Sequence, residues 1–139
     1  MKEVIFGVLL SAAPTLTLAS GSPSSRLDCT ITSNCTQAGK CVDASEAVSF
    51  TLTEKDVARH GEGTYEIAYG DLTTEAQNLT PYGPYMWVVG EDEINTMTVL
   101  GTTESDTANE FKIFATWSVM GIHVPEFGSV KFLNCEGNF

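Results

Sequence analysis

Apolar and polar residues alternate with a period of two along much of this chain. In the run 47–53, Phe50 and Leu52 lie on an apolar face, while serine and threonine fill the other. The runs 64–69 and 111–119 show the same alternation, with aromatic residues on the apolar face. A strand with one buried and one solvated face is typical of antiparallel sheets, so each run predicts a strand.

The predicted strands are short and are separated by Gly, Asp, Asn and Pro, which favour turns. A sequence of this kind predicts an all-β fold: a single small antiparallel sandwich or barrel of about seven to eight strands, stabilised by disulfides. The main strands are expected at 29–32, 47–53, 64–69, 85–89, 95–101, 111–119 and 130–135, with a further short one at 122–124.

The last predicted strand, 130–135, has an ambiguous face. Leu133 and Cys135 share a parity with Lys131, whereas Phe132 has the opposite parity. We therefore expect a bulge there or burial on both faces.

Two segments carry a weak helical signal. Residues 53–61 begin with a capping box of Thr53 and Asp56 and end at Gly61, so they predict one or two helical turns or merely a polar connection. The same two interpretations apply to 103–110.

The N-terminus has the features of a secretory signal peptide, predicted here as residues 1–19. Lys2 precedes an apolar stretch that is too short for a membrane span, and Ala19 suits cleavage. The alternative is a buried N-terminal strand or helix. Residues 20–27 are rich in Gly, Ser and Pro and predict a flexible leader, which leaves 28–139 as the all-β domain. The expected location is secreted or periplasmic, with no membrane insertion after cleavage.

Four cysteines, an even number behind a signal peptide, predict two disulfides in an oxidising compartment. Three pairings are possible. We favour a tight loop closed by Cys35 and Cys41, which leaves Cys29 and Cys135 to join the first strand to the last. The spacing of the cysteines fits neither a zinc site nor a redox motif, so no metal or cofactor is predicted.

The formal net charge of −11 disfavours nucleic acid and anionic membranes as partners. Most carboxylates fall in expected loops, where solvated charge is ordinary, and none of the runs matches a calcium-loop pattern. Two glycosylation sequons begin at Asn34 and Asn78.

No catalytic residue is assigned from the sequence. A nucleophile elbow of the form G-x-S-x-G is absent, and His60 and His123 stand alone in polar or turn-like surroundings. A hydrolase would need one of these histidines in a cleft beside a nucleophile or a carboxylate.

The aromatic segment 79–89, LTPYGPYMWVV, is the best candidate binding feature. Its Pro and Gly residues predict a rigid turn that presents Tyr82, and Tyr85 and Trp87 share one strand face. Aromatic rings on a β-platform can bind sugars or a protein partner. The alternative is that Tyr85 and Trp87 belong to the core, opposite Trp117.

Near the start the chain has DCTIT around Cys29, followed by Cys35 and Cys41, and at the end it has FLNCEGNF around Cys135. This layout of the cysteines resembles that of a group of small exported β proteins of alphaproteobacteria. These proteins have clustered N-terminal cysteines and one cysteine just before the C-terminus. The group has no assigned activity, so the resemblance implies a periplasmic or extracellular location and nothing about mechanism.

Together these features favour a non-enzymatic β domain that binds a protein or a small ligand. A loop-mediated inhibitor or interaction protein is the first alternative, and a small secreted hydrolase is the second.

Overall fold

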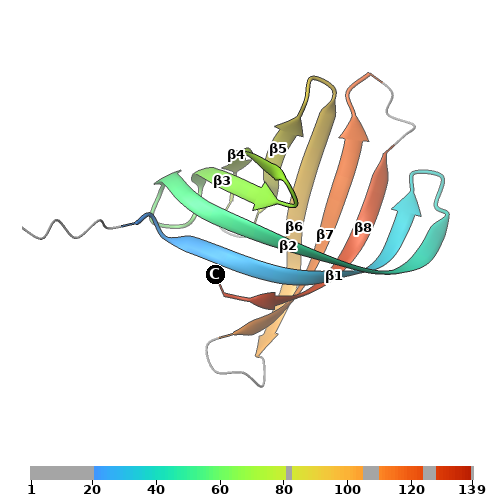
Figure 1. Ribbon diagram of the computed structural model, residues 1–139, viewed down its shortest axis with the longest axis horizontal. Helices are drawn as coiled ribbons and strands as arrows, with labels where there is room; N and C mark the ends of the chain where they lie inside the picture. Colours follow the sequence, from blue (N-terminus) through green and yellow to red (C-terminus); the bar gives the residue numbers. More distant parts are fainter. Residues whose placement is uncertain (1–20, 81–82, 105–109, 124–127, 139) are drawn as a thin grey trace, which may run out of the picture.

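The computed structural model describes residues 21–80, 83–104, 110–123 and 128–138. They form eight strands that close into one antiparallel barrel in the order of the sequence (Figure 1). The all-β prediction is confirmed, and the barrel rather than the sandwich is formed. The strands are β1 Ser24–Thr36, β2 Cys41–Val57, β3 Gly63–Tyr69, β4 Leu72–Asn78, β5 Tyr85–Val89, β6 Glu93–Glu104, β7 Phe111–Gly121 and β8 Ser129–Gly137.

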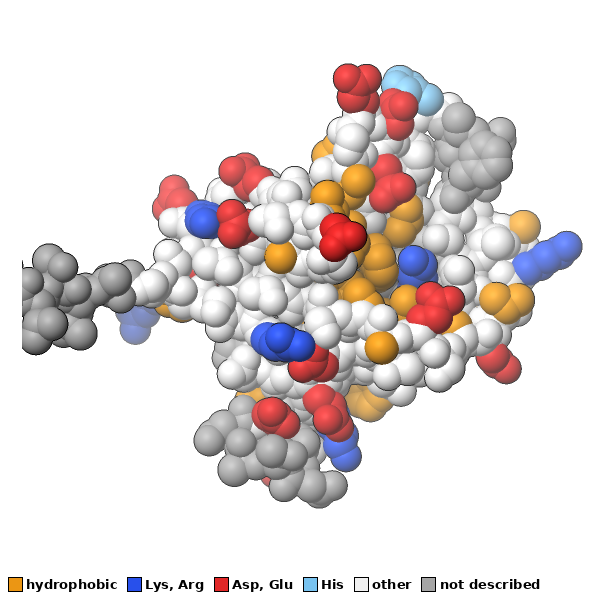
Figure 2. Space-filling view, viewed as in Figure 1, with side chains coloured by type: hydrophobic (Ala, Val, Ile, Leu, Met, Phe, Trp, Pro, Cys, Tyr) orange, Lys and Arg blue, Asp and Glu red, His pale blue; other side chains and the backbone are white. Residues whose placement is uncertain are grey.

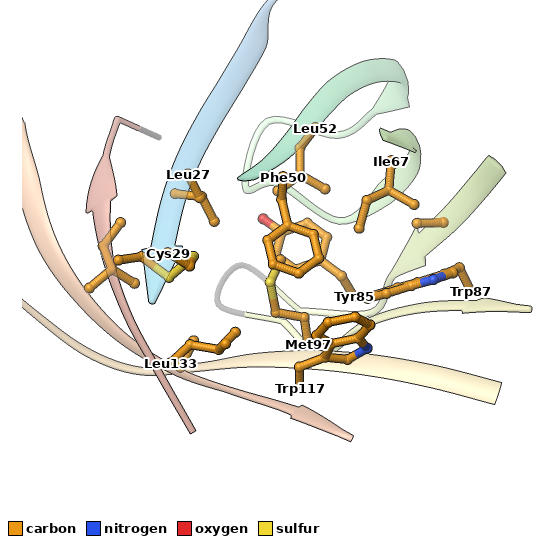
Figure 3. Close-up of a cluster of buried hydrophobic side chains, with 14 of the residues drawn as sticks. Leu27, Cys29, Phe50, Leu52, Ile67, Tyr85, Trp87, Met97, Trp117 and Leu133 are labelled. Carbon is orange, nitrogen blue, oxygen red and sulfur yellow. A yellow bond between two sulfur atoms is a disulfide. The ribbon is translucent and has the colours of Figure 1, made fainter. Parts of the chain in front are cut away.

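The inward-facing side chains of all eight strands form one hydrophobic core inside the barrel (Figure 3). The alternation seen in the sequence explains this arrangement, because every second side chain of a strand points to the same face. Phe50, Leu52 and Ile67, for example, are at most 2% exposed. The other buried apolar side chains are Leu27, Cys29, Ile31, Tyr65, Ala76, Tyr85, Trp87, Met97, Ile113, Ala115, Trp117, Leu133 and Cys135.

Strand β4 is absent from the sequence-based expectation. It pairs with β3 over its full length, from Leu72 opposite Tyr69 to Asn78 opposite Gly63. Its inward positions hold Leu, Thr, Ala and Asn, of which Ala76 and Asn78 are buried. Because only two of these four are apolar, the period-two signal was too weak to reveal the strand.

The helical alternative for residues 53–61 is wrong. Strand β2 continues through this segment to Val57, and a register shift between Glu54 and Asp56 marks an irregularity in its pairing with β3. A turn follows, in which the Gly61 amide donates to the Ala58 carbonyl at 2.9 Å. Pairing with β3 supplies backbone hydrogen bonds that an isolated polar helix of two turns could not match.

Three further boundaries differ from the expected ones or lie beyond the described residues. Strand β1 starts at Ser24, inside the segment 20–27 assigned to a flexible leader, because it pairs there with the end of β2. Ile122 and His123 follow β7 outside any strand, and the rest of the expected strand 122–124 is not among the described residues. Strand β6 extends to Glu104, whereas 105–109 and the predicted signal peptide 1–19 are not described.

Strand β8 alternates regularly, because its pairing with β7 has no register shift, and the irregularity in its pairing with β1 lies in β1, between Ile31 and Ser33. Leu133 pairs with Ile31 and is 1% exposed, whereas Phe132 lies on the outer face and is exposed. The last strand therefore has neither the expected bulge nor burial on both faces: Leu133, Cys135 and Lys131 share the inward face, and Phe132 lies outside.

Both expected disulfides are present. Cys29 on β1 is bonded to Cys135 on β8 inside the barrel, and Cys35 is bonded to Cys41 across the β1–β2 hairpin. The first bond joins residues 106 positions apart and ties together the two strands that close the barrel, whereas the second spans 6 positions.

We predict that the two disulfides differ in their contribution to stability. Replacing Cys29 and Cys135 by Ala removes a long loop constraint, so the free energy of unfolding should fall by about 4–5 kcal/mol, against about 2 kcal/mol for the Cys35 and Cys41 pair. Urea unfolding of the two double variants measures this difference. Equal losses would show that loop closure does not account for the stabilisation.

Candidate functional site

The two ends of the barrel differ. In an up-and-down antiparallel barrel, the loops that follow odd-numbered strands lie at one end, which we call the mouth. In Figure 1 the β5–β6 and β7–β8 hairpins rise at the top of the view, and the β1–β2 hairpin extends to the right. The chain ends and the remaining loops lie at the opposite end.

Side chains at the mouth are less buried than those deeper in the barrel. Val48, Tyr69, Leu72, Val89 and Val119 pack against the core but are only half-buried. Figure 2 shows apolar side chains gathered in a hollow bordered by β2 and by β6–β8, with a basic side chain among them. We call this hollow the mouth recess. Buried core side chains lie beneath it.

Four aromatic rings from four strands meet beneath the mouth recess. Tyr69 on β3 lies at their centre, with ring centroids 5.3 Å from Phe50, 5.7 Å from Trp87 and 5.3 Å from Trp117. Phe50 and Trp117 also meet edge to face at 5.4 Å. Such tilted and edge-to-face contacts are the favoured geometries of aromatic pairs, so the cluster gives the recess a rigid apolar floor.

Each tryptophan of this cluster has its indole N–H satisfied by a side chain. Trp117 donates to the Asn95 oxygen at 2.8 Å, and Asn95, which is fully buried, donates in turn to Glu93 at 2.8 Å. Trp87 donates to the Tyr69 hydroxyl at 3.1 Å. Burial raises the pKa of Tyr69 above the ordinary value of a tyrosine. The rings are therefore held in fixed orientations.

One wall of the mouth recess is polar. Lys131 on β8 points inward, and its Nζ lies 4.0 Å from the centroid of the Trp117 ring. Asn34 on β1 is opposite Lys131 in the register, and its side-chain oxygen is buried without a hydrogen-bond partner among the described residues. This wall carries a cation and an unused acceptor side by side.

The sequence-predicted binding residues separate into two groups. Tyr85 and Trp87 are 5% and 2% exposed and lie inside the barrel among the core side chains (Figure 3). The alternative interpretation, that Tyr85 and Trp87 belong to the core, is therefore correct, and they form no binding platform on the outer surface. Tyr82 lies outside the described residues. Trp87 joins the floor of the mouth recess, whereas Tyr85 contacts Tyr65 elsewhere, at 5.3 Å.

The histidines do not form a catalytic arrangement in the described part of the chain. His60 is exposed in the β2–β3 turn. His123 is exposed, and its Nε2 lies 3.2 Å from Oδ1 of Asp92. Asp92 belongs to the neighbouring β5–β6 hairpin of the mouth. Neither histidine has a hydroxyl hydrogen-bond partner among the described residues. Within the same residues, no group of three or more His, Cys, Asp or Glu is placed to hold a metal ion.

Both sequon asparagines point into the barrel. Asn78 is 2% exposed and its side-chain nitrogen donates to the Gly61 carbonyl at 2.8 Å. Asn34 faces the mouth recess beside Lys131. The folded barrel therefore withholds Asn78 from a glycosylating enzyme.

The outer surface also carries apolar side chains. Phe114 and Phe132, on the neighbouring strands β7 and β8, are 45% and 42% exposed. Single exposed apolar residues are common on protein surfaces, and nothing in the structure covers these.

Comparison with known proteins finds no matching family model, no matching curated protein and no matching solved structure. None of the described residues forms a helix that is long and apolar enough to cross a membrane. The site is therefore defined by its own geometry.

Sequence reasoning did not single out three residues that shape the mouth recess: Tyr69, Asn95 and Lys131. A signal for Lys131 existed, because it shares the parity of the core residues Leu133 and Cys135. Asn95 gave no such signal, since its role depends on Trp117, which pairs with it only across the sheet.

We predict that Asn95 and Trp117 are energetically coupled. Asn95→Leu leaves the buried indole N–H without an acceptor and should lower the free energy of unfolding by about 1–3 kcal/mol. In a cycle with Trp117→Phe, a coupling energy of about 0.5–3 kcal/mol is expected by urea denaturation. Thr96→Val, on the outer face of the same strand, serves as the control and should change stability by no more than about 0.5 kcal/mol. Additive losses would contradict the coupling.

We also predict that Tyr85 makes the protein sensitive to alkali. Burial, the first cause, and the nearby Tyr65 and Glu54 raise the pKa of Tyr85 to about 12, whereas an unfolded tyrosine ionises near about 10. The neutral phenol therefore contributes its full stabilisation below about pH 10 and loses it as the pH rises toward about 12. Urea unfolding at several pH values should show a smaller alkaline decline for Tyr85→Phe. Parallel curves for the two proteins would refute this assignment.

Proposed function

We propose that this protein is an exported, non-enzymatic binding protein that takes a small, ring-bearing apolar molecule into the mouth recess. The observation that carries the proposal is the apolar hollow at one end of the barrel, where the half-buried Tyr69 ring contacts three buried aromatic rings (Figure 2). Small-molecule sites are concave and mostly apolar, with a few fixed polar groups, and the mouths of β-barrels are among their usual places.

The aromatic floor favours a ligand with a ring. The floor of the recess is built by Tyr69 and Trp117, and Trp117 lies directly beneath the Lys131 ammonium. A ring entering from the mouth would meet these aromatic side chains and remove apolar surface from water at about 25 cal/mol per Å². Because hydrogen bonds already fix the indoles, little ordering entropy would be lost on binding.

Export is supported by two independent features. The predicted signal peptide would direct the chain out of the cytoplasm, and the two disulfides are typical of oxidising compartments.

Binding rather than hydrolysis is supported by the surroundings of His60 and His123, which are exposed and have no neighbouring nucleophile in the described residues. The inhibitor alternative would use the turn that holds Tyr82, which the structure does not describe.

We predict that N-phenyl-1-naphthylamine, a neutral two-ring fluorophore, binds the mouth recess saturably at one site. Val119 lies on the inward face of β7, opposite Asn95 and at the edge of the recess. Val119→Trp should fill the recess and weaken binding by about tenfold or more, which corresponds to ~1.4 kcal/mol. Titration with the probe, followed by its emission and by energy transfer from tryptophan, measures this change.

The matched control is Met120→Trp, which adds the same ring at the next position of β7, on the outer face, where Met120 is 47% exposed. It should keep the wild-type affinity. Absence of saturable binding, or an equal loss in both variants, would refute the mouth recess as the binding site.

A further inference from the structure

We infer that the ligand of the mouth recess is an acid: a ring-bearing apolar molecule whose carboxylate or similar anionic group is bound by Lys131. This inference rests on the proposed function and adds the charge of the ligand. It follows from the position of one cation and one unused polar group on the wall formed by β8 and β1.

Lys131 is the only Lys or Arg that the described strands direct into the barrel. Arg26 is ion-paired with Asp28 on the outer face, and Lys55 is ion-paired with Glu66. Lys131 takes part in none of the ion pairs between described residues, and its described contact is the Trp117 ring. A half-buried ammonium without an anion forgoes most of the attraction that would offset its lost hydration. A bound anion would restore that attraction.

Asn34 provides a second, independent observation at the same place. Its side-chain oxygen is buried without a partner in the described residues, and it stands opposite Lys131 across the β1–β8 pair. Buried polar atoms are almost always hydrogen-bonded, so an unpaired one at a recess favours a group that binds there. The other such atom among the described residues, the Asn78 oxygen, lies at the opposite end of the barrel. The Asn34 oxygen is an acceptor and needs a donor, such as a hydroxyl or N–H elsewhere on the ligand, whereas the side-chain amide nitrogen of Asn34 can donate to the anionic group.

The carboxylates that face the mouth do not replace such an anion in the structure. Glu93 accepts the hydrogen bond from Asn95. Glu46 is exposed on the inward face of β2, opposite Ile31 in the register, and makes no ion pair with Lys131. The acidic loop residues Asp71, Glu91 and Asp92 lie on the β3–β4 and β5–β6 loops of the rim, whereas Lys131 belongs to the wall of β8 and β1.

The geometry thus assigns the two ends of the ligand. The ring body would lie on Tyr69, the half-buried ring of the floor, and the anionic group would lie at Lys131, which stands over the Trp117 ring. An ammonium on the face of tryptophan keeps its cation–π attraction while it also binds an anion, because the ring and the anion approach it from different directions. A neutral ring compound would leave Lys131 unpaired and should bind less tightly.

Two fluorophores with one ring skeleton test this inference. N-phenyl-1-naphthylamine is neutral, and 1-anilinonaphthalene-8-sulfonate adds one sulfonate. We expect the sulfonate to bind wild-type protein about tenfold more tightly at low salt, and the difference to shrink as salt is added. In Lys131→Met the two affinities should become equal while the neutral probe binds as before. Lys131→Arg should retain the preference.

Lys55→Met is the matched control, since it removes the same charge from the outer surface. It should leave both affinities unchanged. If the neutral probe binds and the sulfonate binds no more tightly, or if Lys131→Met changes both probes equally or neither, the acidic ligand is refuted and the recess stands. If neither probe binds wild-type protein, the proposed function itself fails. Unchanged affinity for the neutral probe shows that the variant is folded.

Discussion

The pairing of the first strand with the last is the constraint on which the rest of this structure depends. An open sheet of eight strands would leave two exposed edges, and closure removes both. The Cys29–Cys135 bond lies within that pairing, inside the barrel, and holds residues 106 positions apart in one register. Once the register is fixed, the alternation of each strand decides which side chains form the core and which meet water.

The bulge in β1 adds a local consequence to this constraint. From Ile31 to Ser33, β1 advances by two residues while β8 advances by one, so the side chains of β1 change faces relative to those of β8. Asn34 then comes to the inward face opposite Lys131, at the level where the barrel opens. The irregularity thus places Asn34 and Lys131 opposite each other on the polar wall of the mouth recess.

The sequence was sufficient for the fold class, for seven of the eight strands and for both disulfides. Each of those strands has apolar residues at alternate positions, whereas the inward residues of β4 include Thr74 and Asn78 and left no pattern to detect. The aromatic residues could be identified, but their position in the core or on the surface could not be predicted, because the face of Trp87 is set by the pairing of β5 with β4 and β6. The mouth recess could not be predicted, since it depends on which loops share one end of a closed barrel.

A barrel of this kind separates the requirements of stability from those of binding. The deeper layers, with Leu52, Met97 and Ile113 almost completely buried, supply most of the apolar burial and need no ligand to complete them. The mouth layer holds two groups whose interactions are incomplete, namely the ammonium of Lys131, whose described contact is the Trp117 ring, and the oxygen of Asn34. Natural cores seldom retain such incomplete groups without a compensating use. The ammonium and the Asn34 oxygen lie on strands that pair at the mouth, so one ligand with an anionic group and a donor could satisfy both, whereas the unpaired Asn78 oxygen lies apart from them at the end of β4.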